Sequence, residues 1–215
     1  MKARELADLP YAKFLEDFAG DLEEEGDYTT VRFDGNEFTG FVAGNARFIE
    51  SVLSGVRFSS GRLRRTHFND VWIHGAHIVD TDMVETTWLD AEIVNTALAG
   101  VEQFDSTMNR VTFIGCKLIS VNFRSTRMTN ITFANSVLRD VDFGAAELTK
   151  VTFPGSTLED IHFSNAKLKN VDLTTAASLG IGDGYTSMAG ATISLTQAVD
   201  LAPALAQSLG MKVKP

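Results

Sequence analysis

An apolar residue recurs at every fifth position over most of this chain. The stretch VTFPGSTLEDIHFSNAKLKNVDL carries the pattern at Phe153, Leu158, Phe163, Leu168 and Leu173. Counting back from Leu173 in steps of five reaches Phe33 without an insertion, and Gln103 is the single polar residue in that series. The residue two positions earlier is usually small or β-branched, so each five-residue unit offers two positions to a core and three to solvent.

A step of five excludes both an α-helix and a flat strand. Five residues turn a helix through about 500°, so the apolar stripe would wander around the cylinder. A strand alternates faces with a period of two, so successive members of the series would point to opposite sides. A chain that bends equally every five residues closes into coils. Coils stacked about 4.8 Å apart pair their backbones and form a solenoid with a continuous core.

The repeat resembles the pentapeptide-repeat family, in particular its stand-alone bacterial members. That family favours Asp or Asn just before the central apolar residue, as at Asp82, Asn122, Asp142 and Asp172. The resemblance implies a right-handed, four-sided β-helix with four units in each coil. We therefore expect an all-β solenoid, a right-handed quadrilateral β-helix of about seven coils over residues 31–173.

Both ends of such a rod need a cap. For residues 1–30 we predict an amphipathic helical cap, with a helix over residues 9–22 whose apolar side is formed by Tyr11, Phe14, Leu15, Phe18 and Leu22. Its many acidic residues would be repelled by anionic lipid, so we expect a cap and no membrane contact. For residues 174–215 we predict a last partial coil and a C-terminal helix. This helix should begin at a capping box of Ser194 and Gln197, break near Pro203 and end at Gly210.

The C-terminal helix has two interpretations. In bacterial relatives such a segment joins two subunits, so the resemblance implies a head-on homodimer. Its apolar residues would then form the dimer contact, namely Leu195, Val199, Leu201, Leu205 and Leu209. The alternative is a helix that only covers the last coil.

Composition and motifs point away from catalysis and membranes. One cysteine, Cys116, excludes an internal disulfide framework and fits a reducing compartment. The apolar runs are far too short to span a bilayer, and the acidic N-terminal region lacks a signal-peptide pattern, so we expect a cytoplasmic protein. We find no phosphate-binding glycine loop, no nucleophile elbow and no Cys/His ligand set. His74 and His77 should point from different sides of a coil, so we predict no catalytic residue, metal or cofactor.

Negative charge is concentrated in one zone of the sequence. The chain has a net charge of −9, and residues 66–109 hold eight acidic residues without a Lys or Arg. These residues would span about 10 Å of the rod, over which duplex DNA carries about six charges. Residues twenty apart should stack, which places Asp82 below Glu102 and Glu85 below Asp105. We predict an acidic partner-binding patch of these four residues together with Asp70 and Asp90.

Two functions follow, both those of a non-catalytic binding protein. Some bacterial pentapeptide-repeat proteins imitate duplex DNA, bind DNA gyrase or topoisomerase IV and protect these enzymes from quinolones. The resemblance implies such a partner, with no direct binding of nucleic acid. The alternative is a protein-interaction scaffold with an unrelated partner. Its contact would be the weakly charged face of Trp72, Val94, Ile114, Ala134 and Pro154, and the acidic patch would be an ordinary solvated surface.

Overall fold

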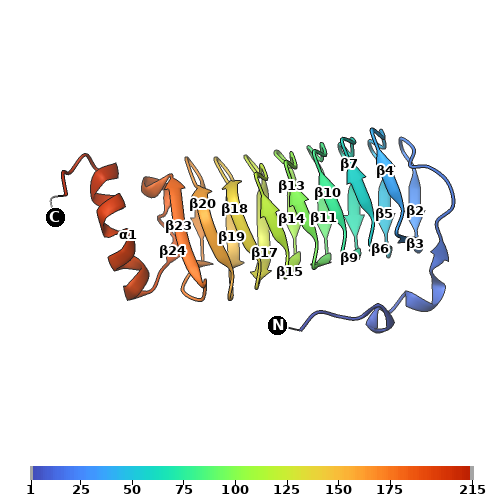
Figure 1. Cartoon of the computed structure of the whole chain (residues 1–215), viewed down its shortest axis with the longest axis horizontal. Coiled ribbons are helices and arrows are strands. Elements are labelled where there is room, and N and C mark those ends of the chain that lie inside the picture. The colour runs from blue at the N-terminus through green and yellow to red at the C-terminus, as the bar shows by residue number, and fades with distance from the viewer. Residues whose placement is uncertain (1, 214–215) are drawn as a thin grey trace.

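A computed structural model describes residues 2–213 and shows a rod of stacked coils (Figure 1). Residues 1 and 214–215, at the outer ends of the predicted segments 1–30 and 174–215, lie outside the described residues. Paired residues are twenty apart, as where Ile78 lies between Phe58 and Leu98. One side of the rod is an eight-stranded parallel sheet with a strand from each coil, so the rod has about eight coils, one more than predicted. Its strands are β4 (Glu37–Thr39), β7 (Arg57–Ser59), β10 (His77–Val79), β13 (Ala97–Ala99), β16 (Lys117–Ile119), β18 (Val137–Asp142), β20 (Thr157–His162) and β23 (Ser178–Asp183).

A second, sixteen-stranded sheet covers two further sides, because long strands such as β17 run around a corner. Its strands are β1 (Glu16–Asp17), β2 (Asp27–Thr29), β3 (Val31–Asp34), β5 (Arg47–Ile49), β6 (Val52–Ser54), β8 (His67–Asn69), β9 (Trp72–His74), β11 (Thr87–Leu89), β12 (Glu92–Val94), β14 (Thr107–Asn109), β15 (Thr112–Ile114), β17 (Arg127–Ala134), β19 (Glu147–Thr152), β21 (Lys167–Lys169), β22 (Val171–Asp172) and β24 (Ala191–Thr192). The fourth side is held by isolated bridges that run from Val42 to Asp142 in steps of twenty. The predicted four-sided β-solenoid is confirmed.

Corners explain the step of five. Every fifth residue from Glu25 to Asn170 has a positive φ, between +48° and +70°. This left-handed conformation turns the chain, and it costs most L-residues about 1–2 kcal/mol, whereas Gly, Asn and Asp adopt it more readily. Those three residue types occupy most of the corner positions. Each unit of five is therefore one side of a square coil.

The core consists of columns of stacked side chains. Phe68 lies between Phe48 and Trp88, with ring centroids 5.0 and 3.9 Å away. In the later coils the largest aromatic residues occupy the other two sides, as where Phe133 stacks between Phe113 and Phe153. Burial of each of these side chains stabilises the fold by roughly 1.5–3 kcal/mol.

Gln103 interrupts this apolar core without leaving its amide nitrogen unpaired. Its side chain is buried, and Nε2 donates a hydrogen bond to Thr86 Oγ1 over 3.2 Å. The same oxygen accepts a hydrogen bond of 3.0 Å from Trp88 Nε1 and lies 3.0 Å from Ser106 Oγ. The polar residue therefore belongs to a small internal network at the point where the aromatic columns change sides.

The predicted N-terminal helix over residues 9–22 was wrong. This region forms two short 3₁₀ turns, η1 (Leu6–Asp8) and η2 (Ala12–Phe14), followed by β1. Its apolar residues serve two different surfaces: Tyr11 packs on the side of the rod, whereas Phe18 stacks on Phe33 at the open end, with centroids 4.3 Å apart. A straight helix could not reach both surfaces. Pairing of β1 with β3 also satisfies part of the sheet edge that a helix would leave open.

The C-terminal helix is confirmed, with one correction. Helix α1 (Leu195–Ser208) begins at the capping box of Ser194 and Gln197, and Gly210 beyond its end has a φ of +77°. The helix continues through Pro203, whereas the sequence predicted a break there. The lost backbone hydrogen bond is tolerated because Leu201 and Leu205 pack against the last coil, next to η3 (Tyr185–Ser187). Over residues 2–213, no helix has both the length and the apolarity that crossing a bilayer requires.

Candidate partner-binding surface

The structure places the six predicted acidic residues on two separate edges of the rod. Asp82 and Glu102 are bridge partners on the fourth side, and Glu85 and Asp105 lie at its corner. Asp70 and Asp90 lie one corner further round, beside the N-terminal segment. The predicted stacking of the four central residues is therefore confirmed, and the other two belong to a different surface.

Arginines from neighbouring coils pair with part of this patch. Arg64 Nε donates to Asp82 Oδ2 over 2.6 Å, and Arg65 lies 3.7 Å from Glu85. On the other edge Arg110 holds both carboxylate oxygens of Asp90, at 2.5 and 2.7 Å, and this hydrogen bonding lowers the pKa of Asp90. Exposed pairs of this kind contribute only about 0–1 kcal/mol each. They nonetheless reduce the negative field at the N-terminal end of the patch.

The same side of the rod remains acidic much further toward the C terminus than the sequence predicted. We call it the acidic side and define it as residues 80–85, 100–105, 120–125, 140–145 and 160–165, which stack in five successive coils. It carries eight acidic residues and one arginine, a net charge of −7, namely Asp80, Asp82, Glu85, Glu102, Asp105, Asp140, Asp142, Asp160 and Arg124. Counting along the chain mixes all four sides, so only a count at every twentieth residue finds this arrangement.

The charge spacing on the acidic side is close to that of nucleic acid. Five coils at about 4.8 Å rise extend over about 24 Å. A net of −7 over that length is one charge per about 3.4 Å, the spacing along one strand of DNA. The carboxylates are attached to a hydrogen-bonded solenoid, so a partner meets them already in position.

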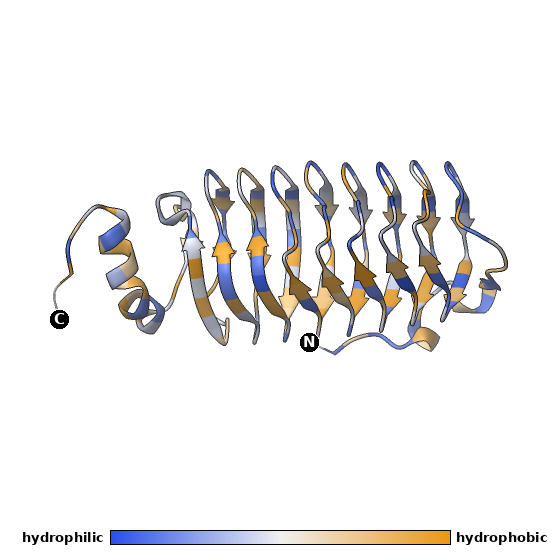
Figure 2. Ribbon diagram, turned by 45° about the horizontal axis from the view of Figure 1, so that its top comes forward, coloured by the Kyte–Doolittle hydropathy of each residue, from blue (hydrophilic) through white to orange (hydrophobic). Residues whose placement is uncertain are grey.

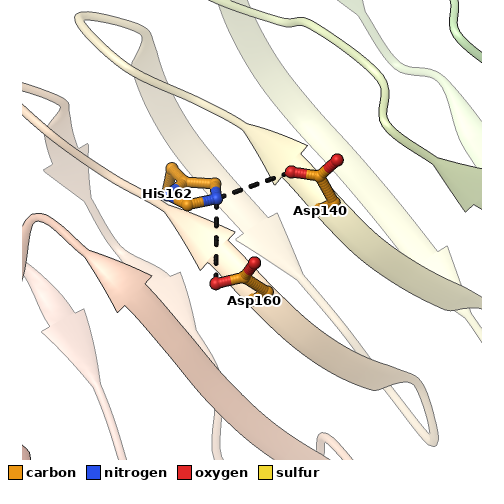
Figure 3. A group of neighbouring side chains, drawn as sticks. All are labelled: Asp140, Asp160 and His162. Carbon is orange, nitrogen blue, oxygen red and sulfur yellow. Dashed lines mark ion pairs between the residues drawn. The ribbon is translucent and has the colours of Figure 1, made fainter.

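Three carboxylates surround one imidazole at the C-terminal end of the acidic side, and Figure 3 shows two of them, Asp140 and Asp160, beside His162. His162 Nε2 lies 3.6 Å from Asp140 and 3.8 Å from Asp160, and Nδ1 lies 3.3 Å from Asp183. Ser120 and Ser164 donate hydroxyl hydrogen bonds to Asp140 and Asp183. His162, Asp140 and Asp160 offer three ligand atoms within 4.8 Å of one another, although all three residues are partly or fully exposed. Exposed carboxylates are well hydrated without a cation, so this geometry alone assigns no metal.

Other candidate groups lie apart. His74 and His77 belong to different sheets, as predicted, because β9 and β10 lie on different sides of the rod. Cys116 is buried, its thiol donates to Ile93 O over 3.2 Å, and burial raises its pKa to about 11. A thiol with a pKa this high is protonated at neutral pH and therefore unreactive.

The weakly charged face is not an open docking surface. The side chains of Trp72, Val94, Ile114 and Ala134 are at most 8% exposed. Trp72 is covered by Leu9 and Tyr11 of the N-terminal segment. The sequence could not show this, because the covering residues lie some sixty positions away in the chain.

The five predicted dimer residues divide between two roles. Leu201 is buried against the last coil and Leu205 packs beside it. Leu195, Val199 and Leu209 point outward and are 83%, 65% and 64% exposed. The helix therefore caps the rod with one side and leaves an apolar stripe on the other.

Comparison with known proteins finds the same repeat. Residues 106–177 match the family model described as a pentapeptide repeat region. No curated protein matches the sequence.

Three solved structures are similar to this chain. QnrB1, a plasmid-mediated fluoroquinolone resistance protein, was solved in a trypsin-treated form; it is 14% identical, with a TM-score of 0.39 over 93% of this chain and 96% of that one. A second structure is HetL, a pentapeptide repeat protein involved in heterocyst differentiation regulation from the cyanobacterium Nostoc sp. strain PCC 7120. It is 17% identical, has a TM-score of 0.29, and the match covers 74% of this chain and 84% of HetL. The third is the pentapeptide repeat protein Rfr23 from the cyanobacterium Cyanothece 51142. It is 12% identical, has a TM-score of 0.31, and the match covers 65% of this chain and 89% of Rfr23.

The assignment rests on the chain itself and on the family match. The five-residue register, the left-handed corners and the parallel pairing at intervals of twenty residues are properties of one continuous solenoid. The matched segment lies within it. Residues 106–177 are therefore a pentapeptide repeat region, and they lie inside a solenoid that keeps the same five-residue register on both sides of them.

Proposed function

We propose that this chain is a non-catalytic, cytoplasmic binding protein whose acidic side occupies a DNA-binding surface of another protein. The specific partner that we propose is DNA gyrase or topoisomerase IV. The observation that supports this proposal is the net charge of −7 over five stacked coils, which gives the charge spacing of one DNA strand.

The chemistry of such a contact follows from how proteins bind DNA. Lysine and arginine side chains supply most of the contacts to phosphates, and these contacts depend little on base sequence. A rigid row of carboxylates can satisfy the same basic groups. The solenoid backbone is already ordered, so binding has little conformational entropy to remove.

Arg124 on the acidic side and Arg64 in the coil before it do not prevent this contact. Arg64 and Arg124 pair with Asp82 and Asp142, but each arginine side chain is about half exposed. Because such exposed ion pairs are weak in water, an arginine of the partner can displace Arg64 or Arg124 from its carboxylate at a small cost in free energy. Within residues 2–213, five carboxylates of the acidic side have no lysine or arginine at ion-pair distance and so remain available to a basic partner: Asp80, Glu102, Asp105, Asp140 and Asp160.

A gyrase supercoiling assay, run with and without a quinolone, tests the proposal. We expect the wild-type chain to inhibit or protect gyrase at low micromolar concentration. A variant with Glu102→Gln, Asp105→Asn, Asp140→Asn and Asp160→Asn should lose the effect. The matched control carries Asp27→Asn, Glu37→Gln, Glu147→Gln and Glu159→Gln, which remove the same charge away from the acidic side. Inactivity of the wild type, or equal activity of both variants, contradicts the proposal.

A further inference from the structure

The N-terminal segment lies along the side of the rod and is held there by side chains. Figures 1 and 2 show it running back beside the coils. We call residues 2–15 the strap. The backbone hydrogen bonds between its own residues close local turns. Among the described residues, Arg4 N–H is the strap's one backbone group that forms a hydrogen bond with a coil. No strand pairing ties it to β6, β9 or β12, so it can leave without disrupting a sheet.

Arg4 anchors the strap in an acidic corner. Its N–H donates to Glu92 Oε1 over 2.8 Å, and its Nε donates to Glu92 Oε2 over 2.9 Å. The side chain of Glu92 is only 13% exposed, which strengthens the pair relative to a surface one. Burial raises the pKa of nearby Asp70, and the charges of Asp90 and Glu50 raise it further. Four carboxylates thus face Arg4 and Arg110, which makes this corner a favourable site for a guanidinium group.

A second contact is apolar and imperfect. Leu9 and Tyr11 are almost fully buried against Val52 and Trp72. Yet the Tyr11 hydroxyl and the Trp72 indole N–H are buried without a hydrogen-bond partner in residues 2–213, and so is the Asn69 side-chain oxygen. Each such group costs about 1–3 kcal/mol. The strap therefore fits the shape of this surface but leaves its polar atoms unpaired.

Space remains beside the strap. A groove of about 410 Å³ is lined by residues 2–6 of the strap and by Trp72, His74, Val94 and Asn95 of the coils. It continues the covered surface from Trp72 toward β12. The acidic corner, the Trp72 surface and this groove together form one elongated site, separate from the acidic side.

We propose that this site is a docking groove for a segment of another protein that adopts the strap's turned backbone, and that the strap is its exchangeable intramolecular occupant. The incoming segment carries an arginine for Glu92, followed five and seven residues later by an aliphatic and an aromatic side chain. That spacing copies Arg4, Leu9 and Tyr11. A phenylalanine in place of Tyr11 fits better, because it removes the unpaired hydroxyl.

Competition in the full-length chain tests the proposal. The probe is a fluorescent peptide of residues 2–15 carrying Tyr11→Phe, and its binding is followed by fluorescence anisotropy. Two full-length proteins are compared: the wild type, and an Arg4→Ala, Leu9→Ala variant whose strap is weakened. We expect the variant to bind the peptide at least tenfold more tightly than the wild type does. Before peptide is added, the tryptophan fluorescence of the variant should be red-shifted relative to the wild type, because Trp72 has lost its cover. Thermal unfolding checks that the coils remain folded.

Matched controls make the result specific. Lys117→Ala removes an exposed positive charge from β16, in the eight-stranded sheet away from the groove, and it should leave peptide binding at the wild-type value. Adding Glu92→Gln to the weakened-strap variant, or using a peptide with Arg4→Ala, should reduce binding at least tenfold. Equal binding to the wild type and the weakened-strap variant, or binding unaffected by Glu92→Gln, would overturn the proposal.

Discussion

At the residue scale, the carboxylates of this protein stack in columns, and their environments differ with the neighbours above and below. Asp90 lies below Arg110, which lowers its pKa. Asp70 occupies the same corner column one coil earlier, where burial raises its pKa and Asp90 and Glu50 raise it further. Two aspartates twenty residues apart therefore differ in the sign of their effect on stability.

Asp70→Asn should raise the free energy of unfolding at neutral pH. The pKa of Asp70 is higher in the folded state, so its ionisation destabilises the fold above that pKa. As the pH falls toward the unfolded-state pKa of about 3.9 the gain should decrease, and below about pH 3 it should vanish because the carboxyl is protonated in both states. Urea unfolding at several pH values measures this. Asp80→Asn is the control, because Asp80 is an exposed corner residue with a similar φ of +48°. A gain that is independent of pH would show that backbone preference is the cause.

At the element scale, each coil is stabilised through the columns that it shares with its two neighbours. Phe133 is fully buried and stacks on Phe113 and Phe153 at 4.7 and 5.2 Å. Gln103 is equally buried in another column, but its contribution is one hydrogen bond to a hydroxyl that is also bonded to Trp88. Phe133 therefore contributes more to the free energy of unfolding than Gln103 does.

Phe133→Ala should lower the free energy of unfolding by about 3–5 kcal/mol, because it opens a cavity between two stacked rings.

Gln103→Met should change the free energy of unfolding by less than about 1.5 kcal/mol, since methionine has a similar volume and Thr86 keeps its hydrogen bond from Trp88. Chemical unfolding of both variants measures the difference. A large loss in Gln103→Met would mean that the polar network, and not apolar packing, holds the central coils together.

At the scale of the whole molecule, both ends of the rod are covered, but only the C-terminal cap exposes an apolar stripe. The N-terminal end is covered by Phe18 and β1, whereas at the C-terminal end α1 covers the last coil and exposes its own apolar stripe. We propose that this stripe joins two copies of the chain about a twofold axis, which would extend the rod and duplicate the acidic side.

Leu195→Lys with Val199→Lys should convert a dimer to a monomer without unfolding the coils, because both side chains point to solvent. Sedimentation velocity at micromolar concentration measures the oligomeric state. Thr196→Lys, on the same helix and also exposed, is the control and should leave the dimer intact. A wild-type chain that sediments as a monomer would contradict the proposal.

Local pattern was sufficient for much of this structure. The step of five predicted the coil, the interval of twenty predicted the stacking of Asp82 with Glu102, and the capping box predicted the start of α1. The corner positions could also have been found, since Gly, Asn and Asp recur there. A solenoid repeats one local geometry, so its residues contact partners at constant separations and the sequence contains the whole register.

The exceptions lie where residues without a constant separation meet. Tyr11 and Phe18 have helical spacing, but the surfaces that they cover, around Trp72 and Phe33, exist only after the coils have stacked. The acidic side likewise joins residues from Asp80 to Asp160, and its charge depends on which arginines fall beside it. The amino-acid sequence was thus enough for the repeat and its register, because both are local. The tertiary structure decided the strap, the pairing of charges and the orientation of the leucines of α1, because these depend on surfaces that the folded rod creates.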